Sequence, residues 1–170
     1  ALRARVIVIG DDFRFGAKRQ GDVAMLTDAE SRFGWRVHRV HAVNVEGKRA
    51  SSSSLRNALA CGDLAKARTI MGRPYTLHGH VVHGRRIGRS IGFPTLNIPV
   101  HHQLMIRGVF VASVEGLGDA PIAAVASLGT RPTVESAGRL LLEVHLFDWQ
   151  GDAYGRIVCV TLHDKIRDEI

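Results

Sequence analysis

Residues 83–98, HGRRIGRSIGFPTLNI, begin with several glycines and arginines. A proline-threonine pair, whose backbone is conformationally restricted, follows directly. Glycine allows backbone N–H groups to turn toward a phosphate, and arginine adds positive charge. No Gly-Lys-Ser or Gly-Lys-Thr sequence follows, so this is not a Walker loop. The pattern predicts either a phosphate-binding loop or a flexible hairpin with solvated arginines. The residues concerned are Gly84, Arg85, Gly88, Arg89 and Gly92.

Thr95 and Asn97 offer two oxygen ligands at the end of the same segment. They are two residues apart on an extended stretch, so their side chains share a face, and Pro94 restricts the backbone just before them. Mg²⁺ takes few ligands from a protein and completes its shell with water and substrate phosphates. On residue types alone a polar pair that closes a turn is favoured, and a magnesium site is the alternative.

A carboxylate lies inside the apolar run LLLEVHLF at 140–147. Period-two alternation places Glu143 on one strand face together with His145 and Phe147. A glutamate among apolar neighbours can be a base that is positioned to accept a substrate proton. An outward-facing glutamate on a half-exposed strand is the alternative.

His78, His80 and His83 invite a metal interpretation. The first two share a strand face, but the third does not, and no nearby carboxylate or cysteine completes a ligand set. A zinc site is therefore not favoured here.

Two stretches in the first part of the chain could bind a nucleotide. GDDFRFG at 10–16 follows an expected strand, where α/β folds place ligands, although its aromatic residues could equally pack in a core. Serines and an arginine begin a helix near residue 51, and helix N-termini attract phosphate. An ordinary N-cap explains the serines equally well. The residues concerned are Phe13, Arg14, Phe15, Ser51, Ser52 and Arg56.

The first part of the chain alternates strand and helix patterns. Residues 6–9 form a short apolar, β-branched run, typical of a strand buried on both faces. Apolar spacing predicts a helix over 22–33, and period two predicts a strand over 35–43. Two short helices follow, one capped by a serine and one by Asp63. This order predicts an α/β domain with a parallel sheet over residues 1–71.

From residue 72 onward the patterns are those of an all-β domain. Short apolar runs are separated by stretches that contain glycine and proline, which predicts a small antiparallel barrel or sandwich over 72–170. The final stretch, LHDKIRDEI, has the pattern of a helix that is just beginning. Because the chain starts almost at a strand and stops within this expected helix, both ends look cut, and we expect a piece of a longer protein.

Composition narrows the class of protein. The chain has 170 residues, is 45% hydrophobic and carries a formal charge of +7, so it should fold and should suit anionic partners. Its basic residues form no long run and only 6% of residues are aromatic, which disfavours a nucleic-acid-binding module with interleaved basic and aromatic residues. The two distant cysteines indicate a reducing cytoplasm. No apolar run approaches the ~20 residues needed to span a membrane.

Taken together and in order, these stretches resemble the prokaryotic bifunctional riboflavin kinase/FMN adenylyltransferase family, also called FAD synthetase. GDDFRFG is similar to the family's GxDFRFG segment, and SSSSLRNAL to its SSTxIRxxL segment, with Ser53 and Leu55 where threonine and isoleucine are usual. Residues 79–97 resemble the kinase signature GxVVxGxxxGRxxGFPTxN. Further along the chain, the family pattern continues in GTRPT, LEVHLFDW, YGR and KIRDE.

The resemblance implies a fold and a chemistry. It implies that residues 1–71 are the C-terminal part of a Rossmann-like nucleotidyltransferase domain, and that residues 72–170 are an antiparallel β-barrel riboflavin kinase domain. The kinase would transfer the γ-phosphate of ATP to riboflavin with Mg²⁺ as cofactor, and the other domain would convert FMN to FAD. Riboflavin, FMN and ATP would be the partners, with no nucleic acid and no membrane, and an oligomer is left open.

The resemblance also implies roles for single residues. The glycine-rich loop from Gly84 to Gly92 would close over the ATP phosphates, and Thr95 and Asn97 would hold Mg²⁺ and phosphate. Glu143 would accept the proton of the ribityl 5′-hydroxyl, and Arg167 would belong to the segment that covers the flavin. The adenylyltransferase would bind nucleotide through Phe13, Arg14, Phe15, Ser51, Ser52 and Arg56.

One departure concerns the adenylyltransferase. The family carries an HxGH motif after the first strand of that domain, and this sequence has none, because His78-Gly79-His80 has the wrong spacing and lies in the kinase part. We therefore expect the parent protein to make FAD, but not this stretch by itself.

Overall fold

The computed structural model describes residues 3–84, 95–100, 103–130 and 140–169. Its chain divides into two compact units, Ala1–Ala50 and Ser51–Ile170, and each is described by itself. The expected loop residues Arg85, Gly88, Arg89 and Gly92 lie outside the described residues.

The first unit is built on a parallel strand pair, β1 (Val6–Gly10) and β2 (Arg36–Val40), as the sequence predicts. Helices α1 (Val23–Asp28) and α2 (Glu30–Phe33) connect them, after the short 3-10 helix η1 (Ala17–Arg19). The side chain of Asp22 caps α1 by accepting a hydrogen bond from the Met25 N–H at 3.0 Å, and Gly34 ends α2 in the left-handed conformation. A small hairpin of β3 (Asn44–Val45) and β4 (Lys48–Arg49) completes the unit.

The prediction that β1 is buried on both faces is wrong. Val6 and Val8 are 58% and 60% exposed, whereas Ile9 is buried. The strand pairs only with β2, and among the described residues no helix covers the face that carries the two valines. The β-branched run therefore alternates between a covered and an uncovered face, which continuous hydrophobicity does not reveal.

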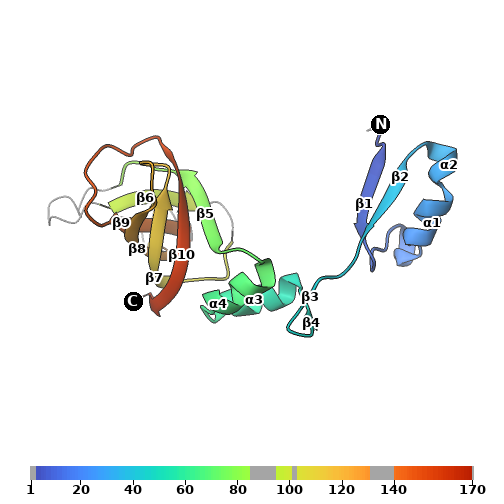
Figure 1. The fold of residues 1–170 in the computed structure, drawn as a ribbon, viewed down its shortest axis with the longest axis horizontal. Helices are drawn as coiled ribbons and strands as arrows, with labels where there is room; N and C mark the ends of the chain where they lie inside the picture. Colours follow the sequence, from blue (N-terminus) through green and yellow to red (C-terminus); the bar gives the residue numbers. More distant parts are fainter. Residues whose placement is uncertain (1–2, 85–94, 101–102, 131–139, 170) are drawn as a thin grey trace. The chain divides into compact units, whose positions relative to one another are not determined.

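The second unit begins with two helices, α3 (Ser52–Ala60) and α4 (Leu64–Met71), which carry the expected caps at Ser51 and Asp63. Helix α4 packs against β10 and β5 of the barrel that follows, and α3 packs on α4 (Figure 1). Their buried side chains join the core of the barrel, as Ala58, Leu59, Leu64 and Ala67.

Six antiparallel strands then form a nearly closed barrel, which confirms the expected fold of this part (Figure 1). Their order in the sheet is β5-β10-β7-β8-β9-β6. The seam between the two edge strands is bridged just after β5, where the Val82 N–H donates to the Asn97 carbonyl at 2.8 Å. The strands are β5 (Tyr75–His80), β6 (Thr95–Val100), β7 (Gly108–Glu115), β8 (Ile122–Thr130), β9 (Leu140–Leu146) and β10 (Ile157–Arg167).

Alternate residues of these strands fill the barrel. On β9 the residues at even positions, from Leu140 to Leu146, are buried and those between them are not. The interior is purely apolar among the described side chains, and its largest members are fully buried. These are Phe110, Ile98, Ile106, Leu128 and Leu142.

The expectation of a helix at the C-terminal end is wrong. β10 continues as a strand to Arg167, because β7 offers a pairing partner as far as Val109. Register shifts between Leu162 and Asp164 and between Lys165 and Arg167 break the period-two pattern, which is why the sequence resembles a helix there.

Candidate active site on the outer face of the barrel

Asn97 on β6 and Glu143 on β9 stand directly opposite each other in the antiparallel register. Thr95 faces His145 one step along the same two strands. Opposed residues in such a pair project to the same face, with Cβ atoms about 4.5–5.5 Å apart. Because the buried even-numbered positions of β9 face the interior, all four of these side chains lie on the outer face. The structure thus brings together the candidate metal ligands and the candidate base.

Among the described residues, Asn97 is the polar residue that is buried, with 7% of its surface exposed. Its Nδ2 donates to the Thr95 carbonyl at 3.4 Å. The backbone of Gly84 covers the carboxamide so closely that a Cβ on Gly84 would lie 2.4 Å from Asn97 Nδ2. Only a glycine allows this contact, so the first glycine of the predicted loop is placed on the candidate metal ligand.

A third strand extends the polar row. Ser127 on β8 is opposite Glu143 on the side away from β6. Glu143 therefore lies between a carboxamide and a hydroxyl on neighbouring strands, and His145 lies between Thr95 and an apolar residue. The His145 ring also meets the edge of the Phe147 ring, at 5.5 Å between centroids and 86° between planes.

Sequence reasoning missed the segment that supports Gly84. The N–H of Val81 donates to Arg156 O at 3.0 Å, and the Gly155 N–H donates to Val81 O at 2.9 Å. The rings of His83 and Tyr154 stack with centroids 3.7 Å apart. The signal that the sequence carries is YGR at 154–156, which matches the family pattern without indicating a role.

Arg167, the predicted flavin residue, ends β10 and is exposed. Its Nη1 donates to the Asp168 carbonyl at 3.0 Å, and its own carbonyl lies so close to Gly108 that a Cβ there would be 2.5 Å away. The carboxylate of Asp168 contacts Lys165 Nζ at 2.6 Å. The hydrogen bond and charge of Lys165 hold the pKa of Asp168 below its usual value.

The predicted nucleotide residues of the first unit follow β1. Phe13 and Phe15 stack at 5.8 Å, and Arg14 pairs with Asp22 at 3.1 Å, which ties the stretch to the cap of α1. Phe15 also pairs through its backbone with Gly21. Phe13 is 39% exposed, so this aromatic pair is not an interior packing cluster.

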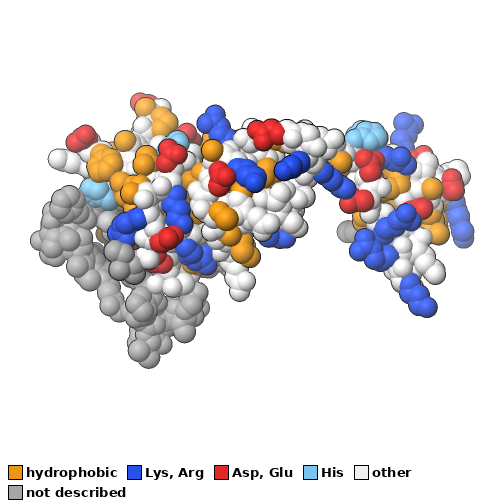
Figure 2. Space-filling view, turned by 90° about the horizontal axis from the view of Figure 1, so that it is seen from below, with side chains coloured by type: hydrophobic (Ala, Val, Ile, Leu, Met, Phe, Trp, Pro, Cys, Tyr) orange, Lys and Arg blue, Asp and Glu red, His pale blue; other side chains and the backbone are white. Residues whose placement is uncertain are grey.

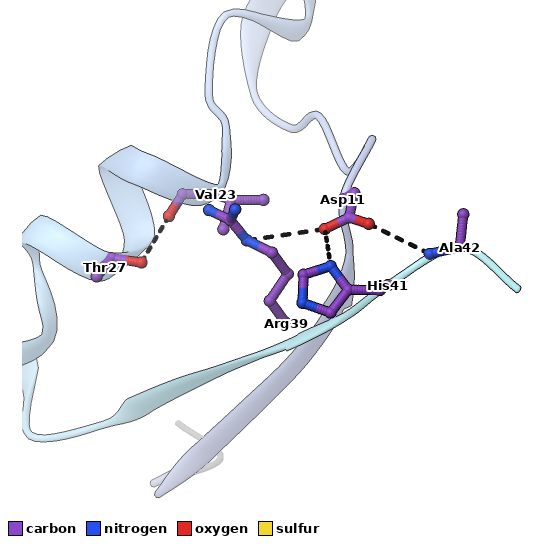
Figure 3. Close-up of polar contacts among 6 residues, drawn as sticks. All are labelled: Asp11, Val23, Thr27, Arg39, His41 and Ala42. Atoms are coloured by element: carbon purple, nitrogen blue, oxygen red, sulfur yellow. Dashed lines mark hydrogen bonds and ion pairs between the residues drawn. The ribbon is translucent and has the colours of Figure 1, made fainter.

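Asp11 links the carboxyl ends of the two parallel strands (Figure 3). One of its oxygens, Oδ1, lies 3.3 Å from His41 Nδ1 and 3.9 Å from Arg39 Nε, and the other accepts from the Ala42 N–H at 3.2 Å. Sequence reasoning gave these residues no role. Their contacts explain how the GDDFRFG turn is fixed at the edge where α/β sheets bind ligands.

Ser51, Ser52 and Arg56 begin helix α3 in the second unit. Ser51 and Ser54 form a reciprocal capping box, in which Ser51 Oγ accepts from the Ser54 N–H at 3.1 Å and Ser54 Oγ accepts from the Ser51 N–H at 3.2 Å. An N-cap is thus present, and the phosphate role that the resemblance implies for these residues stays a prediction.

Within the described part of the chain, no three histidine, cysteine, aspartate or glutamate side chains gather as a metal-binding group. The described helices include none that is long and apolar enough to cross a membrane. The cation site expected at Thr95 and Asn97 stays a prediction.

Comparison with known proteins identifies the group to which this barrel belongs. The family model for riboflavin kinase matches residues 71–170. The chain belongs to the riboflavin kinase family. The matched range covers the whole barrel, including both strands that carry the Asn97–Glu143 pair. A second family model, for FAD synthetase, matches residues 1–54.

Similar proteins cover the chain from end to end. The bifunctional riboflavin kinase/FMN adenylyltransferase of Escherichia coli strain K12 is 45% identical over 169 residues, which are 99% of this chain and 54% of that protein. The protein of the same name from Haemophilus influenzae is 44% identical over 170 residues, which are 99% of this chain and 55% of that protein. The chain spans about half the length of these curated relatives.

A crystal structure from Streptococcus pneumoniae, described as a macrolide-efflux protein, has a similar fold. The match has a TM-score of 0.73 at 33% identity and covers 97% of this chain and 53% of that one.

Proposed function

We propose that residues 72–170 transfer the γ-phosphate of ATP to the 5′-hydroxyl of riboflavin, which yields FMN and ADP. The observation that carries this proposal is the register of β6 and β9, which places Asn97 opposite Glu143 and Thr95 beside them on one face. Membership of the riboflavin kinase family supports the choice of substrates.

Glu143 is the base in this account. It accepts the proton of the riboflavin 5′-hydroxyl as that oxygen forms its bond to the γ-phosphorus and the bond from that phosphorus to the bridging oxygen of ADP breaks. Such a transfer depends mainly on positioning and charge stabilisation, so the chain's task is to hold both substrates in line. The polar row on the outer face supplies a fixed place for the carboxylate, between Asn97 and Ser127.

The residues present fit a magnesium ion. Asn97 and Thr95 offer oxygen atoms, and the carboxamide of Asn97 is buried under the backbone of Gly84, which fixes its orientation. Bound Mg²⁺ would neutralise negative charge on the β- and γ-phosphates. The loop residues Arg85, Gly88, Arg89 and Gly92 remain a prediction for the same phosphates, and Arg167 remains one for the flavin.

The longer protein would also convert FMN to FAD. We infer this from the FAD synthetase match over residues 1–54 and from the bifunctional relatives. In this view residues 1–71 belong to a Rossmann-like nucleotidyltransferase domain that binds nucleotide through the GDDFRFG turn and the start of α3. Cys61 and Cys159 are both free, which agrees with a cytoplasmic enzyme.

One experiment tests the reaction. The purified full-length protein is incubated with riboflavin, ATP and Mg²⁺, and the flavins are separated by chromatography. FMN that depends on ATP supports the proposal, and FAD in addition supports the second activity. A folded protein that binds riboflavin but forms no FMN overturns the kinase proposal.

A nucleic-acid-binding module is the rival function, and its support is the charge of +7. On the face seen in Figure 2, Lys and Arg side chains are interspersed with Asp and Glu side chains rather than gathered in one patch. Tight, salt-dependent binding of an oligonucleotide without FMN formation would favour this rival.

A further inference from the structure

The stacked pair of His83 and Tyr154 joins two segments that are distant in the sequence. Its centroids are 3.7 Å apart and its planes differ by 30°. Tyr154 is partly buried against the core, and its N–H donates to Asp152 Oδ1 at 3.0 Å. The neighbouring Ala153 is 4% exposed. The tyrosine therefore belongs to a fixed part of the barrel, while His83 is an exposed residue held on it.

Hydrogen bonds hold the backbone directly before His83 in place. Val81 exchanges two of them with Gly155 and Arg156, and His80 Nδ1 lies 3.3 Å from Gly155 O. The Val82 N–H then donates a hydrogen bond to the Asn97 carbonyl on β6. Between Val82 and Gly84, the contact described for a side chain is the stack of the His83 ring on Tyr154.

The next residue bears on the candidate metal site. Gly84 lies against the carboxamide of Asn97, where even a Cβ would come within 2.4 Å of Nδ2. The backbone of Gly84 therefore packs directly on the carboxamide, and no space for a side chain remains between them. Any support that fixes the backbone at residue 83 therefore also fixes the orientation of the Asn97 side chain.

We propose that His83 is a positioning residue for the nucleotide phosphates, whose stack on Tyr154 holds Gly84 against Asn97. This inference rests on the proposed function, because it assigns a support to the same site. The chain of contacts runs from the fixed ring of Tyr154 through His83 and Gly84 to the carboxamide that faces Glu143. A phenyl ring at residue 83 would form the same stack.

The test measures the binding of ADP with Mg²⁺ to the full-length protein by calorimetry. We expect His83→Ala to weaken this binding about two- to tenfold, the range that corresponds to the energies of aromatic pairs. His83→Phe keeps a ring on Tyr154 and should bind ADP nearly as the wild type does. His78→Ala is the matched control, because His78 is exposed on β5 and faces Cys159 instead.

A double-mutant cycle makes the test independent of a general loss of structure. If the stack acts as a unit, Tyr154→Ala weakens ADP binding as His83→Ala does, and the double variant is little worse than either single one. Additive effects, or an unchanged affinity in a folded His83→Ala variant, overturn the inference while the proposed function stands. A wild-type protein that binds no ADP overturns both.

Discussion

Asn97 and Glu143 face each other across the β6–β9 pair, although one follows the glycine-rich segment and the other lies deep inside an apolar run. Neither residue is near the other in the sequence, and only strand pairing brings them together. Because the same register places Thr95 beside them, a single feature of the sheet brings together the candidate oxygen ligands and the candidate base.

Replacement of Asn97 should change the Mg²⁺ dependence of the proposed reaction. Asn97→Ala removes the carboxamide oxygen, and the loss of one contact to a charged group lowers activity about 10- to 150-fold at a fixed low Mg²⁺ concentration. The measurement is a Mg²⁺ titration of the initial rate of FMN formation. Asn57→Ala, an exposed position on α3, should leave the titration curve unchanged. Identical Mg²⁺ dependence in Asn97→Ala would remove this residue from the metal site.

Gly84 should tolerate no side chain. A Cβ there would collide with Asn97 Nδ2 at 2.4 Å, so Gly84→Ala displaces the carboxamide and weakens the binding of ADP with Mg²⁺ by about tenfold or more. Gly118→Ala is the matched control, because a Cβ at Gly118 has no atom within 4 Å. Wild-type affinity in both variants would show that the contact does not matter for nucleotide binding.

The interior of the barrel should dominate its stability. Leu142 on β9 is fully buried, so Leu142→Ala should lower the free energy of unfolding by about 2–5 kcal/mol. Val111 on β7 is 43% exposed, and Val111→Ala should stay within about 0.5 kcal/mol of the wild type. Urea denaturation followed by tryptophan fluorescence gives both values. Equal costs would contradict the assignment of β9's even positions to the interior.

How far the sequence predicts this molecule depends on whether a feature is local. The caps at Ser51 and Asp63 and the alternation around Glu143 depend on nearby residues, and the structure confirms them. The exposure of β1 depends on what covers it, which β-branched composition alone does not encode. The strand at the C-terminal end depends on β7 as a partner, and its bulges hide the period of two.

The candidate site could likewise be predicted only in part. Thr95, Asn97 and Glu143 could be selected as residue types that suit the chemistry, but their mutual register depends on contacts between distant strands. The stack of His83 on Tyr154 could not be predicted, because neither residue carries a periodic or motif signal that links it to the other.

The two cysteines should differ in reactivity. Burial, and then the negative charge of Glu115, raises the pKa of the Cys159 thiol, so less of it is thiolate at a given pH. Cys61 is exposed. Iodoacetamide at pH 8 should therefore modify Cys61 first, as followed by mass spectrometry of peptides. Glu115→Gln should speed the modification of Cys159, because it removes the negative charge that raises the pKa of this thiol. Equal rates at both cysteines in the native protein would contradict this account.

The rate of FMN formation by Glu143→Gln, at saturating riboflavin, ATP and Mg²⁺, tests the central claim most directly. Glutamine keeps the size of the side chain but cannot accept the hydroxyl proton, so the rate should fall about 10²- to 10⁴-fold while both substrates still bind. Glu115→Gln, on the end of β7, should retain the wild-type rate. A Glu143→Gln variant that forms FMN within a few-fold of the wild-type rate would contradict the assignment of Glu143 as the base.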